Sequence, residues 1–109
     1  MTAEVNEAVG RWSGRTEDTG TVAVIGLGKI GLPLAAQYSS AGWTVIGVDV
    51  LPDVVETVGA GRSHVLEEPG IAELLAAAHA AGRLRTTLDH AEAASAADVV
   101  VFAVPVMLD

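Results

Sequence analysis

Three glycines and one acidic residue have the types and the spacing that suit a ligand containing phosphate and ribose. Gly26, Gly28 and Gly31 form the pattern G-x-G-x-x-G, and Asp49 closes the next apolar run. The first glycine allows a tight turn, the second lets a pyrophosphate approach the backbone, and the third lets a helix pack closely on a sheet. Because a carboxylate accepts hydrogen bonds from ribose hydroxyls, Asp49 completes a dinucleotide-binding pattern.

The residues between the glycines are expected to contribute their backbone amides. The amides around Lys29 and Ile30 would point at the phosphates, together with the positive end of the helix dipole. The Lys29 side chain is interpreted mainly as solvent-exposed, although it is a cation near the expected phosphates. A nucleoside-triphosphate loop is excluded, because Ala23 and Ile30 stand where its pattern needs a glycine and a hydroxyl.

These residues need two strands and a helix to position them. Apolar, mostly β-branched residues predict a buried strand from Thr21 to Ile25 and a second from Thr44 to Val48. The helix between these strands should present one apolar face to the sheet. The residues at helical spacing on that face are Ile30, Leu34, Tyr38 and Ala41.

The rest of the chain repeats this alternation of strand and helix. The expected elements are a helix opened by Pro52, a helix opened by Pro69, a strand from Leu84 to Leu88, a helix with a capping box of Asp89 and Glu92, and a strand from Val99 to Val104. The last strand is an unbroken apolar run, which is typical of a strand buried on both faces. Right-handed crossovers then give an α/β fold. It is a Rossmann-like parallel sheet of about four strands, in the order 3-2-1-4, with helices on both faces.

The acidic residues also indicate which dinucleotide is bound. The stretch from Val50 to Val54 contains no cation, and Asp53 adds a second negative charge to that of Asp49. A 2′-phosphate would therefore meet two carboxylates, at a cost on the order of a few kcal/mol in a half-buried site. The sequence predicts NAD rather than NADP.

Composition excludes several other functions. The net charge of −8 argues against a nucleic-acid surface or an anionic membrane as partner. The chain contains no cysteine, and His64, His79 and His90 share no metal-ligand spacing. The longest apolar run, from Val99 to Leu108, is too short to span a bilayer. We therefore expect no metal site and no catalytic constellation in this chain.

The start of the chain differs from the remainder in composition. The first twenty residues are acidic and polar and have no apolar core of the kind that a signal peptide carries. We expect residues 1–20 to form a flexible N-terminal tail and residues 21–109 to form a partial dinucleotide-binding domain.

The stretch from Gly26 to Ala35 resembles the opening of the nucleotide-sugar dehydrogenases, the UDP-glucose and UDP-N-acetylmannosamine dehydrogenases. Three later stretches agree with that family in order and spacing: Gly59–Ser63, Glu68–Leu75 and Ala97–Asp109. The resemblance covers nearly everything after Gly20. The glycine pattern alone would equally suit 3-hydroxyacyl-CoA or 6-phosphogluconate dehydrogenases, and the sequence Glu68-Pro69-Gly70 favours the nucleotide-sugar enzymes.

The resemblance implies an NAD-dependent oxidoreductase of polysaccharide biosynthesis in the cytoplasm. Such an enzyme oxidises the C6 alcohol of a UDP-sugar to a uronate with two NAD in succession. The resemblance also implies that the loop of Val104, Pro105 and Val106 lines the cofactor groove, although the family often has threonine where Val106 stands. Family members work through a cysteine thioester, and this chain contains no cysteine. A UDP-sugar substrate and a homodimer are therefore expected only of a longer protein, of which this chain would be an inactive fragment.

Two alternatives stay open on the sequence. The chain could be a stand-alone NAD-sensing module, in which binding rather than hydride transfer is the function. It could also be the opening of a hydroxyacid-type or hydroxyacyl-CoA-type dehydrogenase, a class that uses no catalytic cysteine.

Overall fold

Strands and helices alternate along the chain, as the hydrophobic pattern predicts. The computed structural model describes residues 20–64 and 70–103. Its elements are β1 (Thr21–Ile25), α2 (Gly31–Ser40), β2 (Thr44–Val48), α3 (Pro52–Gly59), α4 (Ile71–Ala80), β3 (Leu84–Thr87), α5 (His90–Ala96) and β4 (Val99–Phe102). The first two strands have the predicted bounds. The helix predicted to open at Pro69 begins instead at Ile71, and Pro69 lies outside the described residues.

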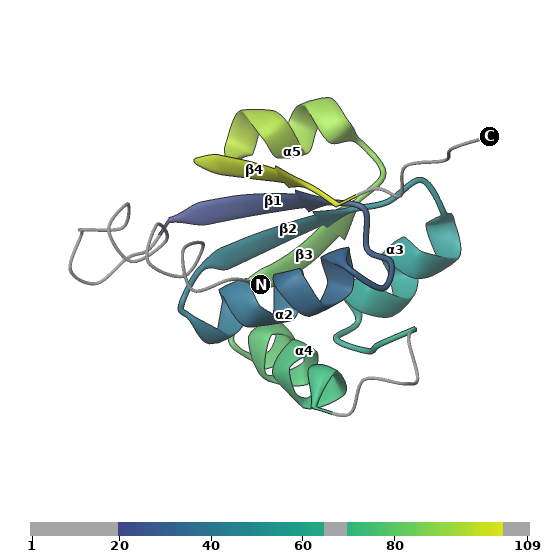
Figure 1. Cartoon of the computed structure of the whole chain (residues 1–109), viewed down its shortest axis with the longest axis vertical. Helices are drawn as coiled ribbons and strands as arrows, with labels where there is room; N and C mark the ends of the chain where they lie inside the picture. Colours follow the sequence, from purple (N-terminus) through teal and green to yellow (C-terminus); the bar gives the residue numbers. More distant parts are fainter. Residues whose placement is uncertain (1–19, 65–69, 104–109) are drawn as a thin grey trace.

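The four strands form one parallel sheet in the order β3-β2-β1-β4 (Figure 1). This is the predicted order 3-2-1-4. In register, Ile25 of β1 lies between Val48 of β2 and Phe102 of β4. The carboxyl ends of these strands therefore meet at one edge of the sheet, which is where α/β folds place their ligand sites.

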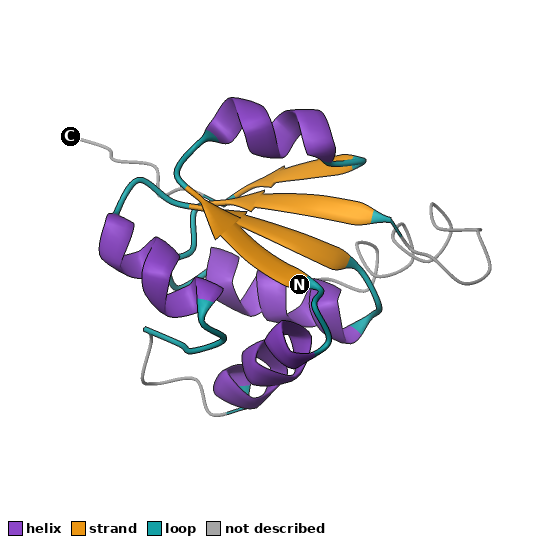
Figure 2. Cartoon of the chain, turned by 180° about the vertical axis from the view of Figure 1, so that it is seen from behind, coloured by secondary structure: helices purple, strands orange, loops and turns teal. Residues whose placement is uncertain are grey.

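Helices cover both faces of the sheet, but unequally. Helices α2, α3 and α4 lie on one face and α5 lies on the other (Figures 1 and 2). Successive side chains of a strand point to opposite faces, so Val22 and Val24 join the larger core while Ala23 and Ile25 join the smaller one. The larger core also holds Trp43, whose ring packs edge-to-face on Tyr38, with the ring centroids 5.7 Å apart.

The predicted sheet-facing side of α2 is wrong in part. Of the four residues assigned to it, Tyr38 alone is fully buried, whereas Ile30 is 69% exposed and Ala41 is exposed. The buried residues of the helix are instead Gly31, Leu32, Ala35, Ala36, Tyr38 and Ser39. The contact at Gly31 accounts for the rotation, because a Cβ there would lie 1.6 Å from the carbonyl oxygen of Gly26. The helix is seated directly on the turn, which fixes the side that it turns to the sheet.

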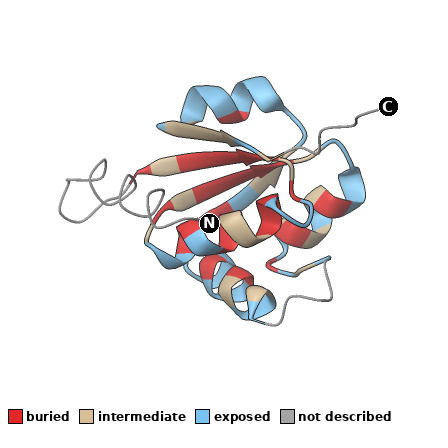
Figure 3. Cartoon of the chain, in the orientation of Figure 1, coloured by how far each residue is buried: buried red, intermediate tan, exposed pale blue. Residues whose placement is uncertain are grey.

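The expectation that the fourth strand is buried on both faces is also wrong. Residues Val99, Val100 and Val101 are half-buried and Phe102 is 72% exposed. Figure 3 accordingly shows β4 mostly in the colour of intermediate burial. Strand β4 stands at the edge of the sheet, and among the described residues it pairs only with β1. Strand position, rather than composition, sets its exposure.

The predicted capping box at the start of α5 is half formed. The Asp89 Oδ1 accepts a hydrogen bond from the amide of Glu92 at 3.1 Å, as predicted. The Glu92 carboxylate does not return to the backbone of Asp89 but pairs with both terminal nitrogens of Arg85, at 3.0 and 2.6 Å. The ion pair joins α5 to β3 across the surface and lowers the pKa of Glu92 through that hydrogen bond.

Candidate cofactor site

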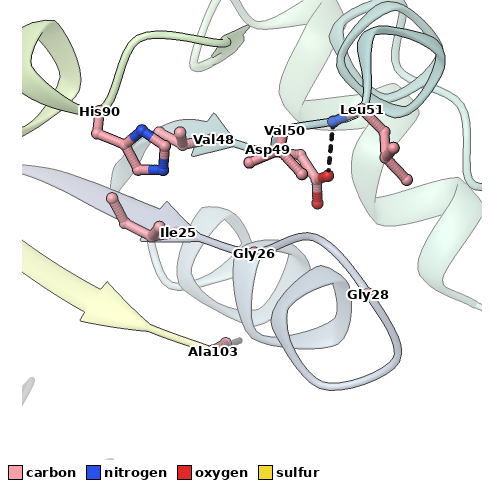
Figure 4. A pocket seen from close by; sticks show the side chains of 9 residues that line it. All are labelled: Ile25, Gly26, Gly28, Val48, Asp49, Val50, Leu51, His90 and Ala103. Atoms are coloured by element: carbon pink, nitrogen blue, oxygen red, sulfur yellow. Dashed lines mark hydrogen bonds between the residues drawn. The ribbon is translucent and has the colours of Figure 1, made fainter. Parts of the chain in front are cut away.

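A cavity of about 310 Å³ opens at the carboxyl ends of β1, β2 and β4 (Figure 4). Its lining residues are Ile25, Gly26, Gly28, Val48, Asp49, Val50, Leu51, His90 and Ala103. Gly26, Gly28 and Asp49 are among the residues that the sequence singled out. The cavity lies beside the point where the strand order reverses between β1 and β4, which is the usual ligand position in such sheets.

The glycine turn is built by backbone geometry that side chains would obstruct. Gly26 has φ of 100°, and its amide donates to the carbonyl oxygen of Val48 at 2.7 Å. Such a φ is strained for any residue with a Cβ, so glycine fits this position. At Gly28 a Cβ would meet no heavy atom within 4 Å. The backbone of Gly28 therefore borders open space rather than protein, as the approach of a ligand requires.

The first amides of α2 are available as donors. Within residues 20–64 and 70–103, no group accepts a hydrogen bond from the amides of Gly28, Lys29 or Ile30. The first bond of the helix runs from the Leu32 amide to the Gly28 carbonyl oxygen at 3.0 Å. The unpaired amides and the positive end of the helix dipole together favour an anion such as a phosphate. The Lys29 side chain is exposed, as predicted, and is not part of the cavity wall.

Asp49 is held in place by two backbone amides. Its Oδ2 accepts from the Leu27 amide at 2.9 Å. Its Oδ1 accepts from the Leu51 amide at 3.1 Å, the bond drawn in Figure 4. Each carboxylate oxygen has a further lone pair, so both still accept hydrogen bonds from a ligand hydroxyl. The carboxylate is half-buried at the mouth of the cavity, where its orientation is fixed before any ligand arrives.

The apolar part of the wall was not predicted. Ile25 and Val48 are the last residues of their strands, and Val50 and Leu51 follow β2 with exposures of 71% and 57%. These flat apolar surfaces suit an aromatic base. They could have been found from the rule that parallel strands end at the ligand site, once the strand order had been assigned.

His90 also lines the cavity and was not predicted as a site residue. It is the first residue of α5, and in Figure 4 its ring stands beside Val48 and faces Ile25. Nothing in the local sequence identifies His90 as a residue of the cavity wall, because its position depends on β3 ending beside β2. His90 and Asp49 are the ionisable side chains of the described wall.

Several other sequence predictions fall elsewhere. Asp53 is exposed and is not part of the cavity wall, so the argument against a 2′-phosphate rests on Asp49 alone. The predicted groove residues Val104, Pro105 and Val106 lie outside the described residues. In the described ranges no three His, Asp or Glu residues are grouped to hold a metal ion, and no helix has the length and apolar character needed to cross a membrane.

Comparison with known proteins identifies the fold and its cofactor. The family model of the UDP-glucose/GDP-mannose dehydrogenase family, NAD binding domain, matches residues 20–107. The chain belongs to this family. Membership decides against the hydroxyacid-type and hydroxyacyl-CoA-type alternatives, and it agrees with the cofactor that the sequence predicts, NAD.

Individual relatives are named as dehydrogenases of nucleotide sugars. The chain is 41% identical over 85 residues to a UDP-N-acetyl-D-mannosamine dehydrogenase of Salmonella typhi, a match that covers 78% of the chain and 19% of the relative. It is 37% identical over 83 residues to a GDP-mannose 6-dehydrogenase of Pseudomonas syringae, covering 76% of the chain and 19% of the relative.

A solved structure agrees with these matches. The UDP-glucose dehydrogenase of the archaeon Pyrobaculum islandicum superposes with a TM-score of 0.75 at 38% identity. The superposition covers 83% of the chain and 21% of that structure. The chain thus spans about a fifth of the length of the nucleotide-sugar dehydrogenases that it matches.

Proposed function

We propose that this chain is the NAD-binding part of an enzyme that oxidises the C6 alcohol of a nucleotide sugar to a uronate. The relatives named as UDP-N-acetyl-D-mannosamine and GDP-mannose dehydrogenases support a nucleotide sugar as the substrate class. The observation that carries the proposal is that one cavity wall holds both the fixed carboxylate of Asp49 and Gly28, whose amide has no acceptor among the described residues.

The residues of the site have separate tasks in this proposal. The backbone at Gly26, Gly28 and Gly31 accommodates the pyrophosphate, and the amides of Lys29 and Ile30 donate to its oxygens. Asp49 accepts hydrogen bonds from the hydroxyls of the adenosine ribose. When bound, NAD supplies the acceptor for the hydride that leaves the alcohol carbon.

The rest of the cavity would hold the adenine. Ile25, Val48 and Leu51 offer apolar surface to the flat base. A 2′-phosphate would be brought against the Asp49 carboxylate, so NADP is disfavoured. The loop of Val104, Pro105 and Val106 is assigned to the cofactor groove on the resemblance to the family.

The remaining assignments concern the whole protein. We assign residues 1–20 to a tail and residues 21–109 to the partial NAD-binding domain. The substrate, the homodimer, the cytoplasmic location and a role in polysaccharide biosynthesis belong to a longer enzyme. The chain contains no cysteine for a thioester, so we expect the 109-residue chain alone to bind NAD without oxidising a sugar.

Two measurements test the proposal. Calorimetry on this chain should detect NAD binding and a weaker affinity for NADP; equal affinities would overturn the assignment of Asp49. The intact mass of the protein captured from its native source should lie several-fold above 11.1 kDa, and the captured protein should reduce NAD with a nucleotide sugar. A native mass near 11.1 kDa with NAD binding and no sugar oxidation would favour the NAD-sensing alternative.

A further inference from the structure

A histidine outside the cavity wall contacts the glycine turn. His64 lies beyond α3, and its ring Nε2 stands 2.5 Å from the carbonyl oxygen of Leu27, 37 residues away in the sequence. A carbonyl oxygen only accepts hydrogen bonds, so Nε2 carries the proton and donates. The contact thereby fixes the tautomer of the neutral ring.

The peptide groups of Leu27 are consequently held from both directions. The amide of Leu27 donates to Asp49 at 2.9 Å, while its carbonyl oxygen accepts from His64 at 2.5 Å. The Leu27 side chain is fully buried, and its Cδ1 lies only 2.9 Å from the point that a Cβ on Gly47 would occupy. The residue between the first two glycines of the motif is therefore fixed through its amide, its carbonyl and its side chain.

We propose that His64 is a positioning residue that orders the glycine turn for the pyrophosphate of NAD. Its Nε2–H holds the Leu27 carbonyl oxygen away from the cavity, so that the following amides of Gly28, Lys29 and Ile30 remain free for phosphate oxygens. The role rests on the proposed function, since it is through the phosphates of NAD that the ordered turn acts on binding.

The size of the effect follows from preorganisation. A turn that is already ordered loses less conformational freedom when a ligand binds, and affinity rises accordingly. One net hydrogen bond corresponds to about a fivefold to tenfold change in affinity.

The test compares variants of His64 on three ligands. His64→Phe keeps a ring but removes the donor, and His64→Gln keeps an amide donor near the position of Nε2. Calorimetry with NAD, ADP and adenosine should show about fivefold to tenfold weaker binding of NAD and ADP to His64→Phe, with adenosine binding unchanged. His64→Gln should recover most of the loss. A loss shared equally by adenosine would overturn the proposal, because adenosine carries no phosphate.

Thr86→Val is the matched control. Thr86 also donates from its side chain to a distant backbone carbonyl oxygen, that of Val55, at 2.6 Å, but it joins β3 to α3 rather than to the glycine turn. Thr86→Val should lower the free energy of unfolding and leave the affinity for NAD unchanged. Weaker NAD binding in both variants to the same extent would assign the effect of His64 to general stability.

A measurement without ligand separates this proposal from the proposed function. Nitrogen-15 spectra of the wild-type ring should show a protonated Nε2 in the neutral form. The Leu32 amide, which donates to the Gly28 carbonyl oxygen at 3.0 Å, should exchange faster with solvent in His64→Phe. If the wild-type chain bound no NAD, the proposed function would fail. These spectra would still show whether the His64 ring donates to the Leu27 carbonyl oxygen. A neutral ring protonated on Nδ1, or unchanged amide exchange, would overturn the role of His64.

Discussion

The Asp49 carboxylate and the Leu27 amide are hydrogen-bonded at 2.9 Å, although 22 residues separate them in the sequence. The bond joins the end of β2 to the turn that follows β1. The acid assigned to the ribose and the turn assigned to the pyrophosphate therefore form one unit. Loss of the Asp49 carboxylate should therefore weaken the binding of both the ribose and the phosphates of the ligand.

Replacement of the acid tests this unit directly. Asp49→Ala removes the acceptor for the ribose and releases the Leu27 amide, so NAD should bind about tenfold to a hundredfold more weakly. NADP should lose less affinity, because the carboxylate no longer repels its 2′-phosphate. Titration calorimetry with both cofactors measures the change. Asp53→Ala is the control, since Asp53 is exposed and outside the wall, and an unchanged cofactor preference in Asp49→Ala would contradict the assignment.

Two glycines should separate stability from binding. In Gly31→Ala the new Cβ would lie 1.6 Å from the Gly26 carbonyl oxygen, so the free energy of unfolding should fall by about 1–3 kcal/mol. In Gly28→Ala the new Cβ meets no protein atom within 4 Å, so the fold should keep its stability. NAD binding should be lost, because the methyl group blocks the approach of the pyrophosphate to the backbone. Denaturant unfolding and calorimetry give the two quantities. A Gly28→Ala variant with full NAD affinity would place the pyrophosphate elsewhere.

The ion pair of Glu92 and Arg85 makes a small part of the stability depend on pH. The hydrogen bond from Arg85 holds the pKa of Glu92 below its ordinary value of 4.5 in the folded chain. The folded chain thus favours the ionised form, so this contribution is present above pH 4.5 and is lost as the pH falls through the lowered pKa. Glu92→Gln should remove it, which urea unfolding at several pH values would measure. Glu56→Gln, on the exposed side of α3, serves as the control; an identical pH profile in Glu92→Gln and wild type would refute the pairing.

The edge of the sheet should promote self-association. Strand β4 pairs only with β1 among the described residues, and Phe102 on it is 72% exposed. Unpaired strand edges with apolar side chains associate with other chains, so the wild-type chain should form larger species as its concentration rises. Phe102→Lys should shift sedimentation profiles toward the monomer. Leu88→Lys, at a half-exposed site just after β3 at the opposite edge of the sheet, should not. A sharp monomer at high concentration in the wild type would count against association through β4.

Most of the fold could be predicted because local signals and topology agreed. The runs after Thr21 and Thr44 are apolar and β-branched, and glycines and prolines separate the elements, so the strand order followed from the handedness of the crossovers. The sheet-facing side of α2 was predicted wrongly in part, because helical spacing alone does not determine which side of a helix faces the sheet. That side was decided by the contact of Gly31 with Gly26, which no periodicity reveals.

The candidate site was only partly predictable for a similar reason. Gly26, Gly28 and Asp49 lie within one sequence motif, whose spacing encodes their proximity. His64 and His90 reach the same region through the packing of α3 and α5, so their roles depend on contacts between distant segments. The exposure of β4 likewise depends on its place in the sheet, which an apolar run does not encode.

The unequal helical layers on the sheet have a consequence for motion in the molecule. In the part of the chain that the structure describes, helix α5 alone covers one face of the sheet, and Ala93 is its one buried residue. Three helices cover the other face. Local opening is easiest where few apolar contacts must separate, so amide protons of α5 and β4 should exchange before those of β1 and β2. The floor of the cavity would then fluctuate on the side of His90 while the glycine turn stayed still. The base of a bound nucleotide would contact the more mobile side of the cavity, and the phosphates of the nucleotide would contact the rigid glycine turn.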